Sequence, residues 1–169
     1  MNEQSKIKNE PRIRRNPFIT ALRDQMEHRA LWLYFLCDEA EKAGQDPATF
    51  APAAIRRCGD HQGANHRRAA GSSSLRRLQQ VLFHHFAREI FEMKIVRCDD
   101  DHLDIDFHYC PLLRAWQTQG CPDAVCGKLC DYAMCGDAGI AAAFGCALEL
   151  PQTIAHGDAS CQLRFVRRD

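Results

Sequence analysis

Three observations predict an α+β fold, in which an antiparallel four-stranded sheet packs with N-terminal and inserted helices. Apolar residues recur every three or four positions through the first half of the chain, as they do in amphipathic helices. The period changes to two in residues 94–98 and 102–109, and strand-like runs return in residues 147–155 and 160–167. Because a short polar turn joins the two runs of each pair, we expect two antiparallel hairpins.

The first predicted helix follows a polar N-terminal arm, residues 1–16, which we expect to be flexible. In residues 17–43 the apolar side chains repeat at helical spacing from Phe18 to Ala40. Gly44 then ends the helix, since glycine is the usual residue just after a helix C-terminus.

The rest of the helical part, up to residue 92, contains one expected interruption. A short helix is predicted over residues 47–57, and residues 58–73 are predicted to be a loop. The glycines and paired arginines of this segment fit an ordinary loop or a mobile lid. One of the serines before Leu75 can cap the next helix, which is expected to end near Glu92.

The sheet and its inserted helices occupy residues 93–169, which form a single domain with residues 17–92. Pro111 is expected to begin a helix, because its fixed φ and missing N–H suit the first helical position. The expected elements of this part are, in order, a turn at residues 99–101, a helix over 111–116, two helices over 123–134 and 138–145, and a turn at 156–158.

The composition is that of one soluble domain, with 46% apolar and 26% charged residues in 169. This excludes a disordered or collagen-like chain. No apolar run approaches the roughly 18 residues of a membrane span, and the N-terminus has no hydrophobic signal core. We therefore expect a cytoplasmic protein without a membrane partner. In that reducing compartment the ten cysteines are expected to be free thiols, metal ligands or catalytic groups.

The net charge of zero conceals an uneven distribution. Residues 1–98 carry 17 Lys or Arg and 11 Asp or Glu, whereas residues 99–169 carry 5 and 11. The basic tracts are short and fit solvated segments, so no nucleic-acid partner is expected.

Cys110 is the strongest candidate for a reactive group. If Pro111 begins a helix, Cys110 is its N-cap, where free backbone N–H groups and the helix dipole stabilise a thiolate. On a regular strand His108 and Asp106 share one face with Cys110, so His108 could act as base or charge partner and Asp106 could orient it. The alternative is a small residue between strand and helix.

The other cysteines allow two interpretations. Five of them, at positions 121, 126, 130, 135 and 146, lie close in sequence, but the chain contains no C-x2-C pair. Most are therefore expected to be small core residues, Cys161 among them. A zinc site remains as an alternative, formed by Cys110, Cys130, Cys161 and His108. Arg164 lies on the opposite strand face from Cys161 and is a candidate for binding a substrate carboxylate.

Three blocks of sequence carry a resemblance to a known family. They are FEMKIVRCDDDHLDIDFHYCPLLRAW, LCDYAMCGDAGIA and LELPQTIAHGDASCQLRF, in this order between residues 91 and 165. The chain resembles the L-2-amino-thiazoline-4-carboxylic acid hydrolase family. The last block departs from the family's usual C-D-F-R-F, because Gln162 replaces the acidic residue.

The resemblance implies a set of site residues. In the catalytic group it favours Cys110, Cys130 and Cys161, with either Asp131 or Asp137 as the acidic partner. For substrate binding it favours Thr153, Gly157 and Asp158, and Arg114 joins Arg164 as a candidate partner of the carboxylate.

The resemblance also implies the reaction, which is hydrolytic opening of a cyclic amidine such as 2-amino-thiazoline-4-carboxylate to a carbamoyl-cysteine. A thiolate of Cys110, or water activated by an aspartate, could attack the ring carbon, and His108 could protonate the leaving atom. No cofactor is expected, and the partner is a small-molecule substrate. Alternatives are another reaction on a small sulfur- or nitrogen-containing metabolite, or a thiol, metal or small-ligand binding module. A homodimer is compatible with exposed sheet edges.

Overall fold

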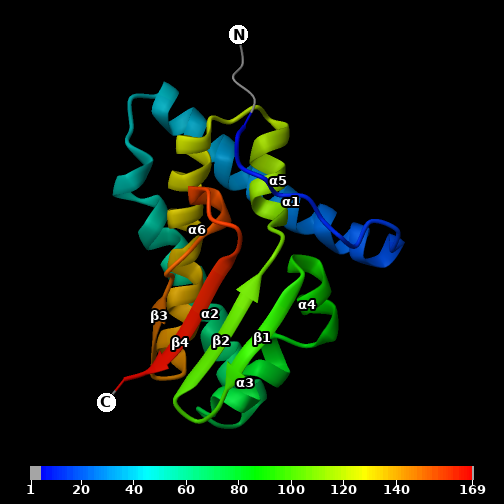
Figure 1. Cartoon of the computed structure of the whole chain (residues 1–169). Helices are drawn as coiled ribbons and strands as arrows, with labels where there is room; N and C mark the ends of the chain where they lie inside the picture. Colours follow the sequence, from blue (N-terminus) through cyan, green and yellow to red (C-terminus); the bar gives the residue numbers. More distant parts are fainter. Residues whose placement is uncertain (1–4, 169) are drawn as a thin grey trace.

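The computed structural model describes residues 5–168 of the chain (Figure 1). The helices are α1 (Pro17–Lys42), η1 (Pro47–Thr49), α2 (Ala51–Ala70), α3 (Leu75–Leu82), α4 (His85–Phe91), α5 (Pro111–Thr118), α6 (Asp123–Ala143) and η2 (Ile154–His156). The strands are β1 (Met93–Cys98), β2 (His102–Phe107), β3 (Cys146–Glu149) and β4 (Cys161–Arg167). This confirms the predicted α+β class. Within residues 5–168, no helix has the length and apolar character needed to cross a bilayer.

The four strands form one antiparallel sheet in the order β1-β2-β4-β3. In the central pair Ile105 lies opposite Leu163, and both are buried. Strand alternation therefore gives the sheet one covered face and one polar face. In Figure 1, α2 and α6 lie behind the sheet, α3 lies at its lower end, and α5 lies beyond the upper end, in front of α1.

The predicted loop over residues 58–73 is wrong, because α2 continues to Ala70. Gly59 and Gly63, which resemble loop residues in the sequence, instead lie where α2 touches α6. A Cβ at Gly59 would overlap the carbonyl group of Gly136, and one at Gly63 would lie 2.8 Å from the Cβ of Ala143. The glycines are thus required by the close approach of two helices.

The break predicted inside residues 123–145 is also wrong, since α6 is one continuous helix. Gly136 lies within it and is tolerated because its neighbours pack against α2. Conversely, the single helix predicted up to Glu92 divides into α3 and α4. Buried Phe83 ends α3, where its ring packs edge-on against Phe165 at 5.9 Å. Tertiary packing outweighs local propensity at both places.

Two strands are shorter than expected. β2 ends at Phe107 because the next two N–H groups leave the sheet: His108 donates to Glu92 and Tyr109 donates to Phe91. β3 ends at Glu149, and the chain reaches β4 through η2 rather than a tight hairpin turn. Pro151 lies in this connection and has no N–H to offer a sheet.

Part of the N-terminal arm is held against the domain, while residues 1–4 lie outside the described residues. The amide of Asn9 is 5% exposed and forms two hydrogen bonds with the backbone of Cys110. Buried Arg23 on α1 donates to the carbonyl oxygens of Ile13 and Ile90. Residues 5–16 therefore have no regular secondary structure but have specific contacts.

Candidate active site

Cys110 occupies the N-cap of α5, as the sequence predicts. Its backbone is extended, Pro111 follows at the first helical position, and its Sγ accepts a hydrogen bond from the N–H of Leu113 at 3.5 Å. The main-chain groups of Cys110 are fixed by Asn9, whose Oδ1 accepts from the N–H at 2.9 Å and whose Nδ2 donates to the carbonyl at 2.8 Å. The thiol is thus placed by a helix end and by the N-terminal arm.

Three of the other predicted groups are brought close enough to Cys110 to act on it electrostatically or to share its surroundings. Cys161, at the start of β4, and Asp137, on α6, both interact with Cys110, and Cys130 interacts with all three. Cys130 and Asp137 are seven residues apart, which is two helical turns and therefore one face of α6. The Sγ of Cys161 accepts from the N–H of Ile154 at 3.3 Å.

These groups differ in their access to solvent. Cys130 is 6% exposed and Cys161 is 8% exposed, whereas Cys110 and Asp137 are half-buried. Cys110 and Asp137 nevertheless lose much of their hydration to surrounding protein atoms. Partial exposure together with strong desolvation is typical of functional sites. We refer to the surroundings that Cys110, Cys130, Asp137 and Cys161 share as the recess.

Burial has opposite consequences for the chemistry of the two groups. It raises the pKa of the Cys110 thiol, although the N–H groups of Leu113 and Leu112 and the charge of Arg29 lower it. Burial also raises the pKa of Asp137 from 3.8 to about 6, again opposed by Arg29. At neutral pH the recess therefore contains a protonated thiol beside an ionised carboxylate that titrates close to neutrality.

The pKa values of the two inner thiols, Cys130 and Cys161, are also raised. Burial raises the pKa of Cys161 to about 12 and raises that of Cys130 as well, and the charges of neighbouring thiols act in the same direction. Neither thiol is thus suited to be the attacking group at neutral pH.

Arg29 is a member of this group that the sequence did not reveal. It lies on α1, is exposed, and its positive charge acts on both Cys110 and Asp137. Within residues 5–168 its guanidinium has no hydrogen bond or ion pair. A lone arginine in an amphipathic helix has no local signal that separates it from a solvated surface residue.

Several predicted residues lie elsewhere. Asp131 is 63% exposed on α6 and accepts from His156 at 2.8 Å. Its charge acts on Cys130, whereas that of Asp137 acts on both Cys130 and Cys110. His108 is half-buried, and in the described part of the chain no hydrogen bond or ion pair joins it to Cys110. The strand face expected to carry both residues ends at Phe107.

The two arginines predicted to bind a carboxylate have other surroundings. Arg164 donates to Asp106 at 2.6 Å and to the carbonyl oxygen of Ile105, on the polar face of the sheet. Asp106 is therefore engaged there instead of orienting His108. Arg114 is exposed on α5, and its charge acts on Glu27 and Tyr109 rather than on the thiol.

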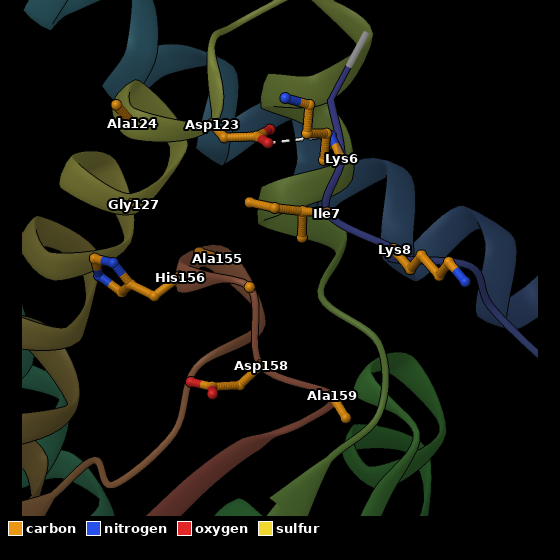
Figure 2. Close-up of a pocket in the computed structure, with 11 residues that line it drawn as sticks. Lys6, Ile7, Lys8, Asp123, Ala124, Gly127, Ala155, His156, Asp158 and Ala159 are labelled. Atoms are coloured by element: carbon orange, nitrogen blue, oxygen red, sulfur yellow. Dashed lines mark hydrogen bonds between the residues drawn. The ribbon is translucent and has the colours of Figure 1, made fainter.

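The segment Thr153–Asp158 forms a tight turn beside a cleft of about 820 Å³ (Figure 2). Asp158 accepts from the N–H of Thr153 at 2.9 Å, and Gly157 has φ 97°, which glycine adopts without strain. Gly157 and Asp158 line the cleft together with Ile7 of the arm and Gly127 of α6. Figure 2 shows His156 reaching from this turn toward Gly127.

Thr153 differs from its neighbours in being buried without a complete set of partners. Its hydroxyl oxygen has no hydrogen bond among the described residues, although its backbone N–H and carbonyl are both engaged. The turn as a whole positions Cys161, because Ile154, which donates to the Cys161 thiol, follows Thr153 directly.

A metal site is not assembled from the residues that the structure describes. Between residues 5 and 168, no three His, Cys, Asp or Glu side chains are grouped so that they could hold a metal ion. The alternative of a zinc site at Cys110, Cys130, Cys161 and His108 therefore lacks the required arrangement of donors.

Comparison with known proteins identifies the family of this chain. The family model for L-2-amino-thiazoline-4-carboxylic acid hydrolase matches residues 23–165, which is most of the sequence and includes the recess and the turn beside the cleft. No curated protein and no solved structure matches the chain. The extent of the family match confirms the resemblance seen in the three sequence blocks, and the chain belongs to the L-2-amino-thiazoline-4-carboxylic acid hydrolase family.

Proposed function

We propose that this protein hydrolyses a small cyclic amidine, such as 2-amino-thiazoline-4-carboxylate, to a carbamoyl-cysteine. The observation that carries the proposal is the pairing of Cys110, at the N-terminus of α5, with Asp137 in one recess. A protonated thiol beside an ionised carboxylate is a nucleophile with its base. The family membership supplies the class of substrate.

The ring carbon of the substrate is bonded to the ring sulfur, the ring nitrogen and an exocyclic nitrogen, which makes it electrophilic. In the proposed reaction, Asp137 takes the proton of Cys110 and the thiolate sulfur bonds to this carbon. The resulting tetrahedral adduct collapses, and either the C–S or the C–N bond of the ring breaks. The departing sulfur or nitrogen takes the proton back from Asp137.

Water then completes the reaction. Asp137, again ionised, removes a proton from a water molecule, whose oxygen bonds to the same carbon. The bond to Cys110 breaks and the thiol is regenerated with the proton from Asp137. The sum is substrate plus one water, giving a carbamoyl-cysteine. In a direct alternative, Asp137 activates water for attack on the ring and no bond to Cys110 forms.

The backbone groups near Cys110 support the first step. The N–H groups of Leu112 and Leu113 favour the thiolate form of Cys110, because they donate toward its sulfur. His108 was expected to return the proton to the leaving atom, but Asp137 suits this role better since it shares the recess with the thiol. The proposed catalytic residues are therefore Cys110 and Asp137.

The test uses purified protein and synthetic 2-amino-thiazoline-4-carboxylate, with the product followed by mass spectrometry. We expect Cys110→Ala and Asp137→Asn each to reduce turnover by at least about a hundredfold, the usual contribution of a nucleophile or general base. Cys58→Ala serves as the control, because this thiol is exposed on α2. Full activity of Cys110→Ala would leave the direct-water route. Absence of turnover by the folded wild type would reject this substrate.

The product identifies the bond that breaks. Cleavage of the C–S bond gives N-carbamoyl-cysteine, which contains a free thiol, whereas cleavage of the C–N bond gives S-carbamoyl-cysteine, which contains a free amine. A thiol reagent applied to the protein-free filtrate distinguishes the two.

A further inference from the structure

Arg29 lies beside the recess, and its guanidinium has no hydrogen bond or ion pair within residues 5–168. The buried residues of α1 include Arg23, Ala30 and Cys37, which are seven apart and form the line that faces the protein. Arg29 is one residue from Ala30, about 100° around the helix. The side chain of Arg29 therefore projects from α1 beside the row of buried residues, and not from the opposite side of the helix.

Two contacts fix this part of α1 close to Cys110. The guanidinium of Arg23 lies 4.4 Å from the ring centre of Tyr109, the residue before Cys110. The indole of Trp116, on α5, donates to the carbonyl oxygen of Ala30 at 3.0 Å. These two contacts hold α1 against both ends of the segment that begins with Tyr109 and continues through α5. Arg29 lies in sequence between Arg23 and Ala30, the two α1 residues that make the contacts.

The charges around Arg29 leave it available to a ligand. Between residues 5 and 168 no carboxylate lies within ion-pairing distance of its guanidinium, whereas Arg23 and Arg164 are each paired with a carboxylate. Its charge does lower the pKa of Asp137, which also belongs to the recess. An arginine that is exposed, unpaired and next to a nucleophile is suited to hold an anion there.

We propose that Arg29 binds the carboxylate of the substrate and so holds the ring carbon over the sulfur of Cys110. The identity of the substrate rests on the proposed function, but the preference for a small carboxylate at Cys110 does not. This inference assigns the carboxylate to α1, in place of Arg114 and Arg164, which the sequence had suggested.

The test compares two alkylating reagents that differ only in charge. Iodoacetate transfers a carboxymethyl group to a thiolate and iodoacetamide transfers a carbamoylmethyl group; both release iodide, but only iodoacetate carries a carboxylate. Rates are measured at pH 8.5 for each cysteine by mass spectrometry of peptides. The ratio of the iodoacetate rate to the iodoacetamide rate reports how strongly the site attracts the anionic reagent, because any change in thiolate population affects both rates equally. Exposed Cys58 gives the reference ratio in the same sample.

We expect the iodoacetate-to-iodoacetamide ratio at Cys110 to exceed that at Cys58 by at least about tenfold, the effect of one charge-assisted pair. Arg29→Gln should lower it to the value at Cys58, and Arg29→Lys should restore part of the difference. Arg77→Gln, on α3 at the far end of the sheet in Figure 1, makes the same change of charge as a control and should leave the ratio unchanged.

Three results would overturn the inference: equal ratios at Cys110 and Cys58, a ratio that depends on Arg114→Gln instead of Arg29→Gln, or no alkylation of Cys110 after complete reaction of Cys58. The last would mean that the recess does not admit a small anion. A ratio that depends on Arg29 in a protein without hydrolase activity would uphold the anion site and reject the proposed function. Hydrolase activity without an elevated, Arg29-dependent ratio at Cys110 would uphold the proposed function and reject the anion site.

Discussion

The side chain of Asn9 forms a reciprocal pair of hydrogen bonds with the main chain of Cys110, 101 residues later in the sequence. One amide satisfies both the N–H and the carbonyl of the residue that caps α5. The backbone of Cys110 cannot join the sheet, which ends at Phe107, and its N–H cannot join the helix, which begins after it. Among the described residues the N–H of Cys110 therefore finds its partner in Asn9, whereas the carbonyl also accepts from the N–H of Arg114 in the first turn of α5.

Asn9→Ala is expected to remove both hydrogen bonds and to leave the part-buried N–H of Cys110 unpaired, while the carbonyl keeps the hydrogen bond from the N–H of Arg114. The expected loss is about 1–3 kcal/mol of unfolding free energy, measured by urea denaturation, together with lower turnover because Cys110 is held less firmly. Asn65→Ala is the control, since Asn65 is exposed on α2. Unchanged stability and turnover of Asn9→Ala would show that the arm does not position the thiol.

Asp137→Asn is expected to stabilise the protein at pH 7.5 while abolishing its activity. The folded-state pKa of Asp137 is about 6 and its ordinary value is 3.8, so above pH 6 the carboxyl is ionised in both states and its burial opposes folding. As the pH falls from 6 to 3.8 the folded state takes up the proton first, and this opposition disappears. The gain from Asp137→Asn should be of the order of 1–3 kcal/mol at pH 7.5 and vanish near pH 4.

Thermal unfolding between pH 4 and 8 measures this gain, with Asp131→Asn on the exposed side of α6 as the matched control. The same ionisation predicts that kcat/KM of the wild type falls as the pH drops below about 6, because the base becomes protonated. A gain in stability that is independent of pH would contradict the assignment of the buried charge to Asp137.

Gly59→Ala and Gly136→Ala are expected to differ sharply although both glycines lie in the contact between α2 and α6. The Cβ of an alanine at position 59 would collide with the backbone of Gly136, which cannot move aside without displacing α6. At position 136 the nearest atom would be a methyl group of Ile55 at 3.4 Å, an ordinary contact. We expect Gly59→Ala to cost about 1–3 kcal/mol or more and Gly136→Ala to be neutral or slightly stabilising, both measured by denaturant unfolding.

Arg23→Met is expected to be strongly destabilising, because it removes the partner of a buried carboxylate. The side chains of Arg23 and Glu92 are each 7% exposed and lie 3.1 Å apart. Glu92 also accepts from the N–H groups of Arg12 and Ile13, so the pair joins the N-terminal arm to α1 and α4. The expected loss is about 3–5 kcal/mol of unfolding free energy. Arg14→Met is the control, since its ion pair with Glu10 is exposed.

The class of fold was predictable because the apolar residues of the strands and of α1 recur with clear periods. The N-cap position of Cys110 was predictable because Pro111 marks a helix start. The position of Asp137 on the helical face of Cys130 could also be inferred, since Asp137 lies seven residues after Cys130. This position was missed because two helices were predicted with a break at residues 135–137, which include Gly136. That glycine interrupts nothing, as α2 packs against the neighbouring turns.

Asn9 and Arg29 could not be found from the sequence by the same reasoning. Each acts through a partner far away in the chain, and neither disturbs a local pattern: Asn9 lies in an irregular polar segment, and Arg29 is an exposed residue of a regular helix. The length of α2 was hidden for a related reason. Gly59 and Gly63 are explained only by α6, whose contacting residues Gly136, Ile140 and Ala143 follow about 80 residues later.

The order of the strands also decides when this protein can become complete during synthesis. β4 is the last strand to leave the ribosome, yet it lies between β2 and β3. Until residues 161–167 emerge, β2 has one open edge and β3 has no neighbour at all, while Cys161 is missing from the thiol group around Cys110. A nascent chain therefore presents unpaired strand edges to other chains from the synthesis of β2 until β4 emerges, and the sheet and the recess are completed by the same strand.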